Sequence, residues 1–145
     1  MVLQLNNVYQ LTMGTIDYDP EVVQFNKTTD EIETGPMGDC VSIIIFYEDN
    51  GMQYAIGRHG LGGIHAINAT AMAQLVPVGA TATAYIIPGP IVGDGITATT
   101  YRDEAISQMR AVFSQHQNQP IAQSTIVLVE ACGNAKFDAN GNRVD

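Results

Sequence analysis

The chain has few cysteines and no long apolar segment. Its 145 residues include two cysteines, Cys40 and Cys132, which are too few for a fold built on disulfides, so thiols are expected at both. No apolar run approaches the roughly 18 residues that mark a membrane span, and no basic stretch precedes an apolar one at the start. We therefore expect a cytoplasmic protein, or an effector exported without a cleaved signal peptide.

Basic residues are also scarce. Six lysines and arginines stand against fifteen aspartates and glutamates, a formal charge of −9. An acidic surface repels phosphate groups, so neither nucleic acid nor a membrane is an expected partner. Seven acids between Asp17 and Asp39 could steer a basic protein partner or form an ordinary solvated face. The length suits one domain over residues 1–145 that needs no cofactor or metal to stabilise its core.

The apolar pattern favours strands. The clearest strand is a β-branched run over 41–47, and Asn50-Gly51 after it is the dipeptide most typical of a type I′ hairpin turn. Other elements are expected as strands over 2–5, 21–25, 52–59, 80–87 and 124–131, helices over 64–75 and 103–116, and a frayed tail over 133–145. We predict an α+β fold in which a mostly antiparallel sheet or β-sandwich is flanked by two or three helices.

The predicted hairpin places Cys40 and His59 on one face. With a two-residue turn at 50–51, Ser42 lies directly opposite His59, and alternation puts Cys40 on the same side as both. Cys40 and His59 are then diagonal neighbours with Cα atoms about 7–8 Å apart, close enough for their side chains to touch. A register shifted by one residue would place them on opposite faces.

A cysteine beside a histidine is suited to nucleophilic catalysis. The imidazole accepts the thiol proton, and the thiolate attacks an electrophilic carbon. The preceding loop could direct main-chain N–H groups, above all those of Gly38 and Asp39, toward an oxyanion. The alternative is structural, because a cysteine in an apolar strand is commonly a small core residue.

Residues around this pair resemble a known family. Segment 34–41, Thr-Gly-Pro-Met-Gly-Asp-Cys-Val, followed by a hairpin to His59, resembles the active-site segment of the CheD chemoreceptor glutamine deamidases. The same Cys-then-His hairpin occurs in the cytotoxic necrotizing factor toxins and related lethal factors. The resemblance implies a β-sandwich flanked by helices, with Cys40 as nucleophile, His59 as general base and Thr34 as a third polar partner. It also implies that the substrate is a protein that presents a glutamine. The enzyme would then be either regulatory or a bacterial effector or toxin.

Two alternatives remain. Segments 39–42, 58–63 and 85–93 resemble motifs of the YfiH (laccase-domain) purine nucleoside enzymes, which share the fold. Those enzymes bind zinc with an upstream histidine, but no histidine precedes Cys40 and their Trp and Arg are missing here, so we expect no metal. A non-catalytic binding or assembly module on the same scaffold is the other alternative. The sequence names neither the target nor the oligomeric state.

The remaining candidate residues have ordinary explanations. His65 follows a glycine-rich break, His116 ends an amphipathic helix, and Cys132 suits a structural thiol at a strand end. Segment 138–142 alternates oxygen-bearing side chains as a calcium loop does, but it lacks that loop's sixth-position glycine and terminal glutamate, so a solvated turn is expected.

Overall fold

A computed structural model describes residues 8–11, 20–38, 40–60, 69–90, 98–113 and 125–145. The strands are β1 (Val8–Gln10), β2 (Glu21–Gln24), β3 (Glu31–Glu33), β4 (Val41–Asp49), β5 (Met52–Gly60), β6 (Ala82–Pro88), β7 (Thr125–Leu128) and β8 (Lys136–Asp138). The helices are α1 (Ala69–Gln74) and α2 (Ala98–Phe113). No helix in these ranges has the length and apolarity to span a bilayer.

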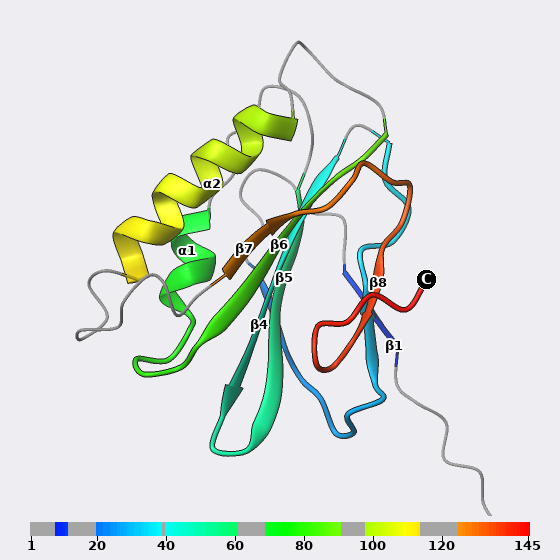
Figure 1. The fold of residues 1–145 in the computed structure, drawn as a ribbon. Helices are drawn as coiled ribbons and strands as arrows, with labels where there is room; N and C mark the ends of the chain where they lie inside the picture. Colours follow the sequence, from blue (N-terminus) through cyan, green and yellow to red (C-terminus); the bar gives the residue numbers. More distant parts are fainter. Residues whose placement is uncertain (1–7, 12–19, 39, 61–68, 91–97, 114–124) are drawn as a thin grey trace, which may run out of the picture.

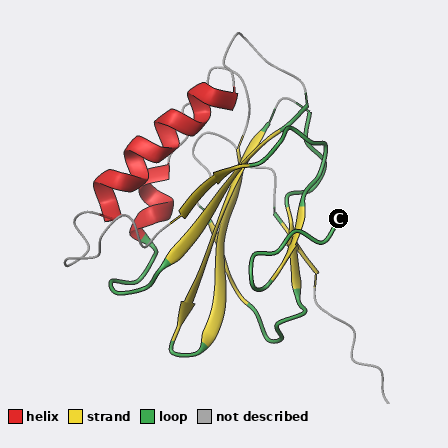
Figure 2. Ribbon diagram, viewed as in Figure 1, coloured by secondary structure: helices red, strands yellow, loops and turns green. Residues whose placement is uncertain are grey.

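The elements form three layers (Figures 1 and 2). A five-stranded sheet of order β2-β5-β4-β6-β7 lies in the middle, with both helices on one face and a three-stranded sheet of order β1-β3-β8 on the other. The β1–β3 and β6–β7 pairs are parallel, and the other four described pairs are antiparallel. The expectation of a strand-rich α+β fold is confirmed, with two mixed sheets.

The β4–β5 hairpin has the expected turn and register. Asn50 and Gly51 have φ values of 51° and 77°, the left-handed pair that a type I′ turn requires. Asp49 therefore pairs with Met52, the first of nine pairs that continue in register until Ser42 lies opposite His59 and Val41 opposite Gly60. One local turn thus determines which side chains share a face ten residues away.

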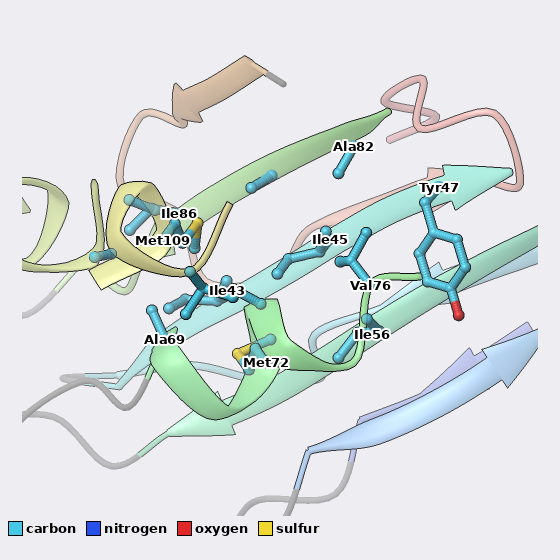
Figure 3. Packing of buried hydrophobic residues seen from close by; sticks show 14 of the residues in the cluster. Ile43, Ile45, Tyr47, Ile56, Ala69, Met72, Val76, Ala82, Ile86 and Met109 are labelled. Carbon is cyan, nitrogen blue, oxygen red and sulfur yellow. The ribbon is translucent and has the colours of Figure 1, made fainter. Parts of the chain in front are cut away.

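Strand β4 is buried on both faces because it lies at the centre of the middle layer. Ile43 and Ile45 point toward the helices, where they pack with Met72 of α1 and Met109 of α2 (Figure 3). The intervening side chains, including Ile44 and Phe46, pack against the three-stranded sheet. The continuous apolar run in the sequence is explained by this double burial.

The expectation that 133–145 frays is wrong. Ala135, Phe137 and Ala139 have at most 1% of their surface exposed, because alternate positions of this segment face the core between the sheets. The centroid of the Phe137 ring lies 4.8 Å from the centroid of the Tyr85 ring and 5.7 Å from that of the Phe46 ring. The Asn and Gly residues that follow Asp138 form the turn after β8. The small apolar residues of segment 133–145 fill the core.

Some element boundaries differ from expectation. Helix α2 begins at Ala98, so Asp103 and Glu104 lie beyond its first turn, where acidic residues are tolerated without marking a start. Strands β1 and β3 were not expected, because three residues carry too little pattern to be recognised. The predicted strand over 2–5, and the residues before 69 and after 113 in the two predicted helices, lie outside the described residues.

We expect Phe137→Ala to lower the free energy of unfolding by about 3–5 kcal/mol. The ring is 1% exposed, and its removal leaves a cavity between the two sheets. Urea denaturation would measure the loss, with Val144→Ala as a control, because Val144 is 43% exposed and should change stability by about 0.5 kcal/mol or less. Wild-type stability in the Phe137 variant would contradict the packing of β8.

Candidate active site

His59 lies on β5 with its ring buried between the two sheets. Only 2% of its surface is exposed, and its Nδ1 lies 2.7 Å from the main-chain carbonyl oxygen of Thr34. A carbonyl oxygen can only accept a hydrogen bond, so Nδ1 must carry the proton. In the neutral ring, Nε2 is then the basic nitrogen.

The Nε2 atom of His59 has no hydrogen-bond partner among the described residues. A buried polar atom without a partner costs about 1–3 kcal/mol, and few such atoms occur in native proteins. A general base needs this arrangement, in which one nitrogen is held and the other can take a proton.

Thr34 is itself held by the segment that enters β8. Its N–H donates to the Ala135 carbonyl at 2.9 Å, and the Ala135 N–H donates to the Thr34 hydroxyl oxygen at 3.1 Å. The Thr34 hydroxyl lies 2.9 Å from the Gly35 carbonyl and 3.3 Å from Asn134 Oδ1. Thr34 therefore contacts His59 through its main chain, and its hydroxyl is used to fix the loop.

Cys40 directly precedes β4, on the side of the hairpin that carries His59. It packs in the core between the sheets with Met37 and is 6% exposed. Ser42, opposite His59, points the same way, because its hydroxyl donates to the Met37 sulfur at 3.3 Å. Neither this cysteine nor Cys132 is in a disulfide. The structure thus brings Thr34, Cys40 and His59 into one buried layer.

The main chain around Cys40 is fixed from two sides. The Gly89 N–H donates to the Cys40 carbonyl, and the Met37 N–H donates to the Gly133 carbonyl, both at 2.7 Å. Gly38 lies between these two anchored residues. Asp39, the other predicted oxyanion donor, lies outside the described residues.

Of the other candidate residues, Cys132 and the segment that begins at Asp138 lie in the part of the chain that the structure describes. Cys132 is half-buried, and its sulfur lies 3.7 Å from Arg143 Nη2. A hydrogen bond with Asp145 raises the pKa of Arg143, so a positive charge faces this thiol. Asp138 Oδ1 accepts the main-chain N–H groups of residues 140 and 142, which is the geometry of a capped turn. His65 and His116 lie outside the described residues.

Sequence reasoning did not assign the residues that support this layer. Ala135 contacts Thr34 across 101 residues, and Gly89 reaches Cys40 from the end of β6. Only main-chain atoms of these two residues take part, so no side-chain motif could have marked them. In the described ranges, no three His, Cys, Asp or Glu side chains form a group that could hold a metal ion.

The chain was compared with protein-family models and with curated proteins. No protein-family model matches the chain, and no curated protein matches it. The resemblance around segment 34–41 remains one of short motifs. The geometry of the buried layer therefore carries the functional inference.

Proposed function

We propose that the chain is a cysteine-dependent amidohydrolase that deamidates a glutamine side chain of a protein substrate. The single observation that carries the proposal is the state of His59. Its Nδ1 donates to a fixed carbonyl at 2.7 Å, and its Nε2 has no partner in the described residues, on the face that carries Cys40. A nucleophile, a base and a group that orients the base are the components of a catalytic triad.

In the proposed reaction Cys40 is the nucleophile, and His59 acts first as a base and then as an acid in each half-reaction. Nε2 of His59 takes the proton of the Cys40 thiol, and the thiolate attacks the carboxamide carbon. Main-chain N–H groups, for which Gly38 and Asp39 are our candidates, stabilise the oxyanion. The His59 imidazolium gives its proton to the departing ammonia and leaves a thioester. Nε2 then deprotonates a water that attacks the thioester carbon, and the C–S bond breaks to release glutamate. The His59 imidazolium returns its proton to the departing thiolate, which restores the thiol and the neutral ring.

Burial favours a side-chain amide over a peptide bond as substrate. With Cys40 only 6% exposed and His59 only 2% exposed, the attacked group must enter a nearly covered site. A peptide bond is flanked by chain on both sides, whereas a glutamine carboxamide ends a slender, flexible stem. The formal charge of −9 further favours a basic protein as the partner.

The layer arrangement also supports this class. Two facing sheets, with helices on the outer face of the larger one, agree with the sandwich that the deamidase resemblance implies. The nucleophile begins the central strand, and the base lies on the returning strand. We propose the deamidase architecture on these grounds.

The test is to incubate the protein with basic proteins and glutamine-containing peptides, and to measure ammonia and peptide masses. We expect ammonia release with conversion of glutamine to glutamate, no chain cleavage, and no effect of EDTA. Turnover of adenosine or inosine that a chelator abolishes would instead favour a metal-assisted nucleoside enzyme. No ammonia, together with a Cys40 that iodoacetamide does not modify, would support a non-catalytic module.

A further inference from the structure

Gly89 lies against the loop that carries the proposed nucleophile. We call residues 37–40 the nucleophile loop, of which Met37, Gly38 and Cys40 are described. Gly89 follows β6, which pairs with β4 so that Pro88 lies opposite Val41. The Gly89 N–H donates to the Cys40 carbonyl at 2.7 Å. The end of β6 is therefore in direct contact with the main chain of Cys40.

The contact leaves no room for a side chain at Gly89. A Cβ added there would lie 2.2 Å from the Gly38 carbonyl oxygen, 2.9 Å from its carbon and 3.0 Å from the Cys40 carbonyl oxygen. All three are main-chain atoms, so they can give way only if the loop itself moves. Gly89 is not among the residues with positive φ, so its backbone could accept an L-residue. The need for glycine arises from the contact alone.

We infer that Gly89 is a positioning residue for Cys40, a role that rests on the proposed function. The missing side chain lets β6 come close enough to hold the nucleophile loop in place. That placement fixes the main chain of Cys40 on the face of the hairpin that carries His59, whose basic nitrogen has no hydrogen-bond partner in the described residues. An error of about 1 Å in such a placement can cost around 10²-fold in rate.

Two other glycines provide a graded comparison. A Cβ at Gly133 would lie 3.9 Å from the Met37 carbonyl oxygen, an ordinary contact with the same loop. A Cβ at Gly60 would lie 3.1 Å from the Val41 carbonyl oxygen, which is tight. Neither has a positive φ. Gly133→Ala is thus a matched control for Gly89→Ala, and Gly60→Ala is a milder displacement beside Cys40.

The experiment compares the three alanine variants in the full chain. It measures the thermal midpoint, kcat and KM for ammonia release, and the pH profile of Cys40 modification by iodoacetamide, mapped by peptide mass. For Gly89→Ala we expect kcat to fall at least about tenfold. We also expect the modification midpoint to move toward the value of an ordinary cysteine, about 8.5, because the thiol is displaced from His59. A purely structural role would lower the thermal midpoint and leave this profile unchanged.

The outcomes separate the inference from the proposed function. Wild-type kcat and pH profile in Gly89→Ala, or equal losses in Gly133→Ala, would overturn the role of Gly89 while the wild-type activity stands. If Gly89→Ala does not fold, Gly60→Ala should show a smaller shift of the same sign, and no shift there would overturn the inference. A wild type whose Cys40 modification does not depend on His59 would overturn the proposed function and the role of Gly89 together.

Discussion

Cys40→Ser should abolish ammonia release, with kcat reduced at least about 10³-fold. The hydroxyl that replaces the thiol is a far weaker nucleophile near neutral pH, and His59 does not convert it into an equivalent of a thiolate. The side chain differs little in size, but the site is 6% exposed, so burial of the more polar hydroxyl should cost up to about 1–3 kcal/mol of stability. The thermal midpoint therefore accompanies the rate, to show that the variant is folded in the assay. Ammonia release, measured with a coupled glutamate dehydrogenase assay, would give the rate.

Cys132→Ser is the matched control for this experiment. Cys132 is half-buried and contacts Arg143, so the variant should keep wild-type activity. Retained activity in Cys40→Ser would remove Cys40 as the nucleophile. Loss of activity in both variants, with intact folding, would show that the reaction needs a second thiol that the proposed mechanism does not include.

His59→Asn should separate catalysis from stability. The Asn amide nitrogen comes close to the position of Nδ1 and can still donate to the Thr34 carbonyl, a contact of 2.7 Å in the wild type. The variant lacks any counterpart of Nε2, so it cannot take the thiol proton. We expect the rate to fall by about 10²–10⁴-fold, while the free energy of unfolding in urea changes by about 1 kcal/mol or less.

His59→Ala supplies the comparison. It removes the donor as well as the base, and it leaves the buried Thr34 carbonyl without this hydrogen bond, at a cost of about 1–3 kcal/mol. Both variants should be equally inactive, but only His59→Ala should be clearly less stable. A fully active His59→Asn would mean that His59 serves only to anchor Thr34.

The hairpin was predictable because its determinants are local. Asn50-Gly51 selects the turn, the turn sets the register, and the β-branched run that follows Cys40 has strong strand preference. Together they place Ser42 opposite His59 from sequence alone. The face shared by Cys40 and His59 follows from that register, since side chains alternate along a strand.

The rest of the site depends on contacts between distant segments. The three-stranded sheet is built from three-residue strands, which are too short to carry a periodic signal. Its strand β8 lies in a segment whose Asn and Gly content suggested a frayed end. Thr34 could be singled out by resemblance, but its carbonyl, held through Ala135, is a main-chain group, and sequence patterns do not reveal such groups.

The most direct test of the central claim is cross-linking of Cys40 to His59 with dibromoacetone. The Cys40 sulfur displaces one bromide and His59 Nε2 displaces the other, which joins the two side chains through a three-carbon bridge. We predict one cross-linked product that unites the peptides of Cys40 and His59, and its absence in His59→Asn. If Cys40 is modified without a cross-link, or is bridged to another residue, the thiol and the imidazole are not the adjacent pair that catalysis requires.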